Sequence, residues 1–509
     1  MPAEKKDLGP ATPGLSHERQ ARAVQVVRDV MAGTLHLRDQ GERYLPKFPK
    51  EHEKAYRARL NASVLFNATK KTRKAFAGMI FRKDPVIGDD VPDPIQEHME
   101  NVDLTGRDLA SFLRDHWEDA EDDGHAYIFV DMDPPVEGAE SPLDEADLRP
   151  YWVGIRKQDV LGFTAGKVAG RKVLTSLRYR ESVVEEDGRW GEVEVHRIRE
   201  YFLGVDPDNP DQLRVFFNVW ELDRDKEYPG ESAEDWAVVA GWEHSDAGGM
   251  MAISRIPITA TYTGRTGFFE SGPPLLDLAL ENIKHYQTDS DNQNLARTAK
   301  VQTLVFTGEK ADDIKSVAVG PGNAIVLEDP ESDAKWIGAD GSSFKDFAED
   351  LRNIERRMAV MGLSMLMSES RAAETAESKR IDKTESDSQL AASAKDLQRA
   401  AGEALSFHAE WMDEEEGGHV GINTDFETEP LDSATFKEFR ELWAERGISW
   451  ETLMEIARRG EALPDGFDLE EERERIATEE ARRMDAVTGA MFNGDEGDEE
   501  EEGEQEEAA

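Results

Sequence analysis

The sequence contains no cysteine among its 509 residues. This absence excludes disulfides, thiolate zinc sites and a cysteine nucleophile. No apolar run approaches the roughly 20 residues that a helix needs to cross a bilayer. The first residues, MPAEKKDLGPATPG, also lack the apolar core of a secretion signal. We therefore expect no membrane association, and we expect residues 1–40 to form a flexible arm that carries proline and glycine.

Basic residues are scarce as well. The chain has 61 Lys and Arg against 108 Asp and Glu, a formal net charge of -47. Ten acidic residues and no basic one lie between Asp495 and Glu507, which leaves about -37 for residues 1–493. Proteins that grip nucleic acid normally neutralise phosphate with clustered Lys and Arg, so this composition argues against a general nucleic-acid binder. The acidity is interpreted either as a solubility device or as a surface that must not adhere to a polyanion.

One basic segment stands out against this background. Residues 67–83 read NATKKTRKAFAGMIFRK and contain no acidic residue. Three interpretations remain open for it: a solvated or subunit-facing helical face, a contact with an acidic patch on a neighbour, and a contact with nucleic acid. Phe76 and Phe81 are the segment's aromatic residues, so the series of stacking platforms found in single-strand binders is missing.

The hydrophobic pattern predicts an α+β fold. A four-residue stripe predicts a helix from about His52 to Phe81 that ends at Asp84-Pro85, and a second helix is expected from about Leu109 to Glu121. The second helix should bury Phe112, Leu113, His116, Trp117 and Ala120. A β-branched and aromatic strand, HAYIFVDM, follows at residues 125–132, and residues 151–262 have the alternation of a mixed or antiparallel β domain.

The second half of the chain predicts long helices. A helix is expected over residues 272–299, followed by a small β insert over 300–343 and another helix over 344–361. The segment 362–374 is rich in Met and Ser and interrupts the helical pattern, and a helix over 375–412 follows it. The spacing of three and four predicts its buried spine: Leu390, Ala394, Leu397, Ala401, Leu405, His408 and Met412.

Two small helices, at residues 433–446 and 449–459, are expected near the end of the chain. The last 16 or so residues are acidic and of low complexity, so residues 486–509 are predicted to form a disordered acidic tail.

The search for catalytic motifs is negative. The sequence has no Gly-rich phosphate loop, no Gly-x-Ser-x-Gly elbow and no two histidines at the four-residue spacing of a zinc protease helix. His116 and His125 lie nine residues apart, and we expect them to be satisfied core histidines. The segment DPDNPDQL contains Asp206, Asp208 and Asp211. Its Asp, Asn and Pro residues are typical of an ordinary turn. We therefore expect no catalytic residues, no metal and no cofactor.

The order of these segments resembles that of portal proteins of tailed bacteriophages and prophages. The resemblance covers about residues 41–470, and it lies in the order and spacing of its stretches more than in a single motif. The stretches are ERYLPKFPKEHEKAYRARLNASVLFNATKKTRKAFAGMIFRKDP, HAYIFVDMDPP, RPYWVGIRKQDVLGF, GPPLLDLALENIKHYQTDSDNQN, the Met-rich break, ETAESKRIDKTESDSQLAASAKDLQRA, GINTDF and LWAERGISWETLMEIARRGEALPDGFD.

This resemblance implies a ring, typically of twelve identical subunits, at one vertex of a capsid. Double-stranded DNA would enter and leave through its channel without sequence-specific binding. The implied partners are the terminase large subunit, a head–tail adaptor, and the major capsid or scaffolding protein. The implied location is the portal vertex of the virion, with the host cytoplasm during assembly.

The resemblance also implies a division of the chain into parts. They are an outer wing over 41–265, stem helices over 272–299 and 344–361, a clip over 300–343, a tunnel loop over 362–374, a long helix over 375–412 and a crown over 419–485. The residues of the tunnel loop expected to face DNA are Met365, Met367, Ser368, Glu369 and Ser370. Lys70, Lys71, Arg73 and Lys74 would form a basic face on the wing, which we expect to meet a neighbouring subunit or the capsid shell rather than DNA.

Two other classes of function stay open at this point. One is another structural protein of a phage head, such as a minor capsid or adaptor component. The other is an acid-rich hydrolase that uses scattered Asp and Glu to hold a metal ion. A closed ring of about a dozen 57.0-kDa copies favours the portal, whereas a monomer or dimer with hydrolytic activity contradicts it.

Overall fold

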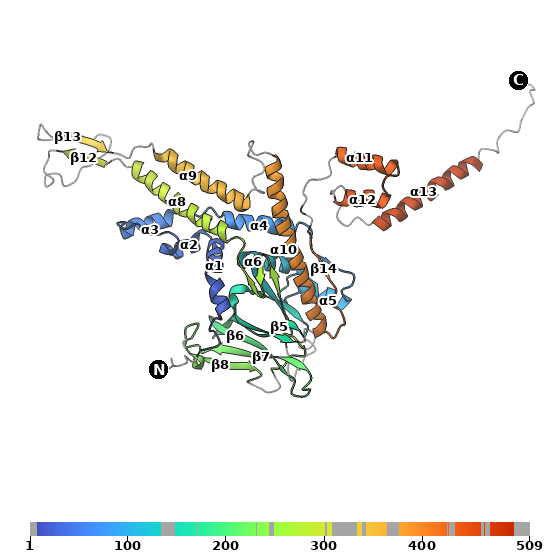
Figure 1. Cartoon of the computed structure of the whole chain (residues 1–509), viewed down its shortest axis with the longest axis horizontal. Coiled ribbons are helices and arrows are strands. Elements are labelled where there is room, and N and C mark those ends of the chain that lie inside the picture. Colours follow the sequence, from blue (N-terminus) through green and yellow to red (C-terminus); the bar gives the residue numbers. More distant parts are fainter. Residues whose placement is uncertain are drawn as a thin grey trace, which may run out of the picture. The chain divides into compact units, whose positions relative to one another are not determined.

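Helices and strands are mixed through the chain, as Figure 1 shows for the computed structural model. The α+β fold class predicted from the sequence is confirmed. The structure describes residues 8–133, 148–168, 170–230, 232–243, 249–300, 303–307, 333–337, 343–363, 376–424, 426, 433–459, 463 and 469–492. The chain divides into two compact units, Met1–Phe426 and Glu427–Ala509. Within the described residues, no helix has the length and apolarity to cross a membrane.

The centre of the first unit is strand β2, His125–Asp131, which coincides with the predicted strand. It lies between β3, Tyr151–Arg156, and β9, Ile258–Tyr262, in an antiparallel three-stranded sheet. All seven residues of β2 are buried, so both faces of this sheet are covered. A near-continuous apolar strand is the pattern expected in such a position.

Two helices cover one face of this sheet. They are α6, Leu109–Asp123, and α10, Ala376–Trp411, and they pack around Ile128 and Val130. The predicted buried face of α6 is confirmed in full, and the predicted spine of α10 is buried from Leu390 to His408. Side chains three and four residues apart share one side of a helix, so both faces followed from local spacing.

A second sheet covers the other face, where Phe129 packs against Tyr179 and Tyr201 and Tyr127 belongs to the same core. Its five strands are antiparallel neighbours in chain order. They are β4 (Val160–Val168), β5 (Arg171–Asp187), β6 (Gly191–Val205), β7 (Leu213–Leu222) and β8 (Trp236–Gly241). The β-rich region expected at residues 151–262 is confirmed.

The expectation of a flexible N-terminal arm is wrong for most of residues 1–40. Two helices, α1 (Leu15–Ala32) and α2 (Thr34–Asp39), occupy this segment. Val27, Val30 and Leu37 are fully buried in the core that also contains the start of α8. Proline and glycine are confined to the first fourteen residues and Gly33, whereas the apolar spacing that follows is helical.

The single helix expected from His52 to Phe81 is two helices. α3 spans Glu53–Ala62 and α4 spans Ala68–Ile80. The Asn67 side chain caps α4 by accepting from the backbone N–H of Lys70 over 2.9 Å. In the break, Val64 of the predicted buried stripe is 54% exposed.

A pair of antiparallel helices follows the sheets. α8 spans Leu276–Lys300 and α9 spans Ser343–Met358, close to the predicted bounds. Their contacts run in opposite directions along the two helices: Glu281 with Arg357 at 3.2 Å, His285 with Glu355 at 3.6 Å and Asn292 with Phe347 at 3.3 Å. Strands β12, Thr303–Thr307, and β13, Asp333–Ile337, pair antiparallel between them in the chain. A π-helical turn, Ala359–Leu363, follows α9.

The second unit contains the two predicted small helices, α11 (Ser433–Ala444) and α12 (Trp450–Arg459), and a third, α13 (Leu469–Phe492). The predicted disorder of residues 486–509 is wrong for its first part, because α13 continues to Phe492. The rest of that tail lies outside the described residues. The remaining short elements of the first unit are β1 (Val86–Ile87), α5 (Asp93–His98), β10 (Arg265–Gly267), β11 (Glu270–Ser271) and β14 (Val420–Gly421).

Candidate functional site at the basic helix

The four basic residues predicted to form one face of α4 divide into an inward and an outward pair. Arg73 is 13% exposed and donates to Oδ2 of Asp122 over 2.7 Å and to Oε2 of Glu118 over 2.9 Å. Lys70 is partly buried, and its Nζ lies 3.3 Å from the carbonyl oxygen of Met31. Lys71 and Lys74 are exposed, and the described residues offer neither of them an ion-pair partner. The prediction of one four-residue surface face is therefore wrong.

The acceptors for Arg73 belong to an acidic run at the end of α6. Glu121, Asp122 and Asp123 are 5%, 1% and 0% exposed. The carboxyl end of a helix is its negative end, so three buried carboxyl groups there need compensation from elsewhere. Gly124 then ends the helix at φ +89°, a conformation that disfavours other residues.

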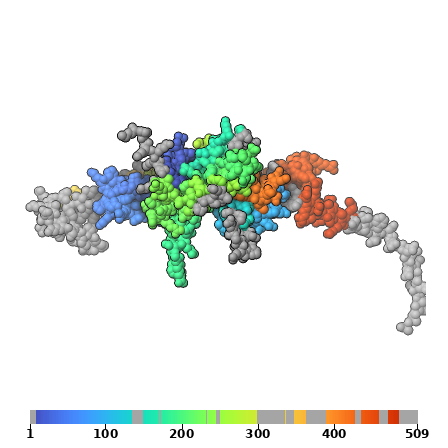
Figure 2. Space-filling view, turned by 90° about the horizontal axis from the view of Figure 1, so that it is seen from below, coloured from blue at the N-terminus to red at the C-terminus, as the bar shows by residue number. Residues whose placement is uncertain are grey.

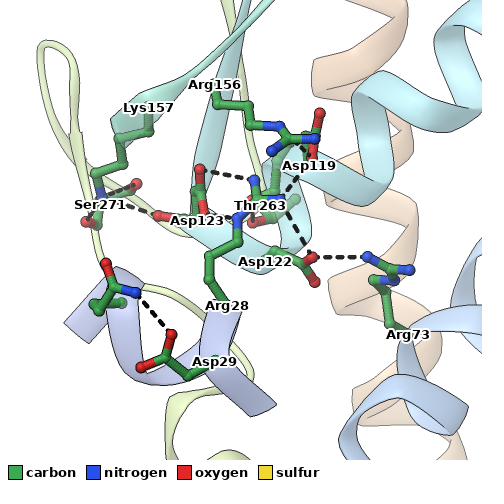
Figure 3. A network of polar contacts seen from close by, with 12 residues as sticks. Arg28, Asp29, Arg73, Asp119, Asp122, Asp123, Arg156, Lys157, Thr263 and Ser271 are labelled. Atoms are coloured by element: carbon green, nitrogen blue, oxygen red, sulfur yellow. Dashed lines mark hydrogen bonds and ion pairs between the residues drawn. The ribbon is translucent and has the colours of Figure 1, made fainter. Parts of the chain in front are cut away.

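The compensating cations come from three other segments of the chain (Figure 3). Arg28 of α1 forms a two-pronged contact with Asp123, at 2.7 and 2.9 Å, and also donates to Asp119 at 2.9 Å. Burial disfavours the charge of Arg28, but these carboxylates outweigh burial and raise its pKa. Arg73 of α4 supplies the second cation. The two arginines thus tie α1 and α4 to α6.

The third cation is Lys157, which follows β3. Its Nζ donates to the carbonyl oxygens of Asp123 at 2.9 Å and Ser271 at 2.7 Å. Burial lowers its pKa to about 8. The hydroxyl of Ser271 bonds Nδ1 of His125 over 2.6 Å, while Nε2 of His125 bonds the Tyr127 hydroxyl over 2.7 Å. This cluster therefore joins the central sheet to the chain that leads into α8.

The acidic run does not titrate as ordinary surface carboxylates do. Burial and the neighbouring Asp122 raise the pKa of Glu121 to about 8, so Glu121 is largely protonated at neutral pH. Burial also raises the pKa of Asp122, although Arg73 and Arg28 oppose that shift. The buried carboxyl groups thus differ in charge, and the two arginines neutralise those that ionise.

The two histidines expected to be satisfied in the core, His116 and His125, have hydrogen-bond partners there. Nε2 of His116 bonds the Thr261 hydroxyl over 2.8 Å, and His125 has the partners given above. Asp206 forms a local turn, in which it accepts from the backbone N–H of Asp208 over 2.9 Å. Across the described ranges, no group of three or more His, Asp or Glu residues has the arrangement of a metal site.

The predicted tunnel-loop residues Met365, Met367, Ser368, Glu369 and Ser370 lie outside the described residues. The structure does show what precedes them. The π-helical turn packs against α4 so closely that a Cβ on Gly362 would lie 2.7 Å from Cγ2 of Thr72. The outward lysines, next to Thr72 in sequence, therefore belong to a helix that supports the start of the predicted loop.

Sequence reasoning missed the buried acidic run and its arginines. A signal was present, since Glu121, Asp122 and Asp123 directly follow the apolar face of α6 and precede a buried strand. Acidic residues in that position require a cation from a distant segment. The sequence offers many arginines, and spacing does not identify which of them reach the run.

One family model and several solved structures match parts of the chain. Residues 274–412, which include α8, α9 and α10, match a family described as a domain of unknown function, DUF4055. No curated protein matches the chain. A chain from the neck of an empty GTA particle computed with C6 symmetry is 12% identical over 78% of this chain and 89% of its own, with a TM-score of 0.37.

A chain from the neck of a native GTA particle computed with C12 symmetry is 11% identical over 75% of this chain and 86% of its own, with a TM-score of 0.35. A chain from the virion of a native gene transfer agent particle is 12% identical over 75% and 85%, again with a TM-score of 0.35. At such identities and TM-scores, none of these likenesses assigns a role to this chain.

Proposed function

We propose that this protein is a portal subunit that closes into a ring-shaped channel at one capsid vertex for DNA packaging and ejection. The observation that carries the proposal is the arrangement of α8, β12–β13, α9, the π-helical turn and α10 in one continuous stretch. The described part of this stretch contains two antiparallel helices that carry a small β module, then a π-helical turn and a 36-residue helix, and this order agrees with the stem, clip and long helix of the resemblance.

The anchoring of α8 supports a stem role. Asn282 is fully buried, and its Oδ1 accepts from the backbone N–H and the hydroxyl of Thr69 over 3.2 and 3.0 Å. Its Nδ2 donates to the carbonyl oxygen of Phe66 over 2.7 Å. Further along α8, the hydroxyls of Ser290 and Ser63 bond over 2.7 Å. One end of the helix pair is thus held by the N-terminal helices, and its other end carries β12–β13, to which we assign the docking of the terminase large subunit and the head–tail adaptor.

The charge of the chain supports a conduit. A channel must confine a DNA duplex without retaining it, and each lysine or arginine on a phosphate would add an electrostatic contact that resists sliding. The inward basic residues Arg28 and Arg73 are already neutralised by carboxylates of the same chain. We assign the outward pair Lys71 and Lys74 to an acidic surface of the neighbouring subunit or the capsid shell.

Native mass spectrometry and negative-stain imaging of the purified chain test the proposal. We expect a closed ring of about twelve 57.0-kDa subunits. In a second test, a variant with residues 301–340 replaced by a short Gly-Ser linker should still form rings but should lose binding to the terminase large subunit. A chain that stays monomeric or dimeric at high concentration contradicts the proposal, as does a linker variant that still binds terminase fully.

A further inference from the structure

The longest strands of the five-stranded sheet continue beyond it as a two-stranded arm. β5 and β6 stay paired as far as Asp187 and Gly191. Among the described residues, β4 pairs with β5 only up to Tyr179, and β7 pairs with β6 only from Arg197 onward. Residues 182–196, here named the arm, therefore have no strand on either edge. Figure 2 shows the arm as a narrow green projection from the body.

The tip of the arm combines an aromatic side chain with acidic surroundings. Trp190 is 86% exposed, and the guanidinium of Arg189 lies 4.8 Å from the centre of its ring. The arm carries five acidic residues and a single arginine: Glu185, Glu186, Asp187, Glu192 and Glu194. An isolated two-stranded ribbon is marginal in water, and exposed tryptophan is enriched at protein interfaces. The arm therefore has the composition of an anchor for a partner with an apolar, basic recess.

Such a recess exists in the same chain. A cavity of about 500 Å³ lies between the start of α1 and strands β4 and β5. Its walls include Leu161, Phe163 and Phe269, and its basic residues are Lys157, Arg178 and Arg180. The described residues that line it include no Asp or Glu, although the chain has 108 of them. Arg180 is paired with Asp159 over 2.8 Å, so the complementarity of the cavity to the arm in charge rests on Arg178, and its apolar walls match the aromatic tip.

Arg178 gives the cavity a cation that no carboxylate balances among the described residues. Its guanidinium donates to the backbone carbonyls of Pro10 over 2.8 Å and Thr12 over 3.3 Å. The first turn of α1 lies beside it, and Gly14, which precedes this helix, provides no side-chain cap. Both features favour the binding of an acidic side chain at this end of the cavity.

We propose that the Trp190 tip of one subunit inserts into this cavity of the next subunit, so that each copy is both donor and acceptor. The occupant must be a second molecule, because Arg178 and Arg180 lie at the base of the strand that carries the tip. About ten paired residues separate base from tip, roughly 30 Å of extended chain, and the continuous pairing keeps the tip from folding back. A head-to-tail contact closes identical subunits into a ring when the rotation from one subunit to the next adds up to a full turn. The inference rests on the proposed ring.

The absence of cysteine allows a direct test by cross-linking. Arg189→Cys places a thiol on the tip, and Leu15→Cys places one at the cavity rim, where Leu15 is 71% exposed. The two single variants are purified, mixed, assembled and treated with a short bismaleimide. We expect a cross-linked dimer from the mixture, and a ladder of oligomers from a chain that carries both substitutions. Val205→Cys, 56% exposed and outside the cavity lining, is the matched acceptor control and should give no dimer.

A second variant measures the contribution of the tip to assembly. Trp190→Ala should raise the concentration at which half of the chains form rings by about tenfold or more, whereas Val184→Ala, on the arm but away from the tip, should change it less than threefold. Normal ring formation by Trp190→Ala, together with no cross-link between the Arg189→Cys and Leu15→Cys variants, overturns the arm contact but leaves the portal proposal standing. A cross-link without closed rings supports the contact and contradicts the portal proposal.

Discussion

Arg73 of α4 donates to Oδ2 of Asp122 on α6 over 2.7 Å, across 49 positions of sequence. This ion pair gives part of the basic segment a structural role inside the subunit. A cation that the sequence offers for contact with DNA or with a neighbour is held inside its own subunit, next to a carboxylate that is 1% exposed. Of the four basic residues expected to form a face of α4, Arg73 and Lys70 therefore point inward, and Lys71 and Lys74 are the exposed pair.

Removal of Arg73 should destabilise the subunit strongly. Arg73→Ala leaves the buried carboxylate of Asp122 without its nearest cation, and we expect a loss of about 3 kcal/mol in the free energy of unfolding. Lys74→Ala, one residue away but exposed, is the control and should change the value by less than about 0.5 kcal/mol. Urea denaturation measures both. Equal effects of the two variants would show that Arg73 contributes no more than a surface lysine.

Glu121 should make the subunit less stable as the pH rises. Its pKa is about 8 in the folded chain against an ordinary value near 4.5, so the folded state binds this proton more tightly than the unfolded state. The stability that this group contributes is complete below pH 4.5 and is lost as the pH rises through 8. Glu121→Gln keeps the shape and removes the titration.

Between pH 5 and pH 8, the wild-type chain should lose on the order of 3 kcal/mol more than the Glu121→Gln variant. The difference between their urea midpoints across this range isolates the contribution of Glu121 from those of all other groups. Parallel curves for the two proteins would refute the raised pKa.

His408 should make the subunit less stable as the pH falls. It is fully buried, and its Nε2 lies 2.9 Å from Nδ1 of His98. Burial first, and then the nearby His98 and Arg149, lower its pKa to about 3. The folded state therefore binds a proton at His408 more weakly than the unfolded state does. The stability that this group contributes is complete above pH 6.5 and is lost as the pH falls from 6.5 toward 3. At pH 5 the loss from His408 is about 2 kcal/mol.

The variant His408→Asn keeps a polar side chain beside His98 and cannot take up the proton. It should therefore be less stable than the wild type at pH 7 but should lose about 2 kcal/mol less between pH 7 and pH 5. Chemical denaturation at the two pH values measures this. A wild-type loss equal to that of the variant would mean that folding does not shift the pKa of His408.

The outward lysines should affect assembly and leave folding unchanged. Lys71→Glu combined with Lys74→Glu reverses two exposed charges, so we expect an unfolding free energy within about 0.5 kcal/mol of wild type and a reduced yield of rings. Sedimentation and negative-stain imaging measure ring yield. If rings form normally while DNA packaging is blocked, the pair contacts DNA instead of a neighbour. Arg73 is left out of this variant because its loss would destabilise the subunit and obscure an effect on assembly.

The elements with strong local periodicity were predictable. The buried face of α6, strand β2 and the spine of α10 all follow from the spacing of apolar residues, which depends on helix and strand geometry alone. The helices at residues 15–39 were missed because the flexible arm indicated by Pro and Gly in the first fourteen residues was predicted to reach residue 40. The break at residues 63–67 was missed because a four-residue stripe continues across it, although Asn67 is a good helix cap.

The amino-acid order by itself determined the kinds of element, their sequence along the chain and the surplus of negative charge, because these depend on neighbouring residues and on composition. The tertiary structure alone decided which charged side chains are paired inside the subunit. Arg28, Arg73 and Lys157 meet one acidic run from three separate segments, whereas Lys71 and Lys74 stay exposed. Such pairings join residues far apart in the chain, and only the folded backbone brings them within hydrogen-bonding distance.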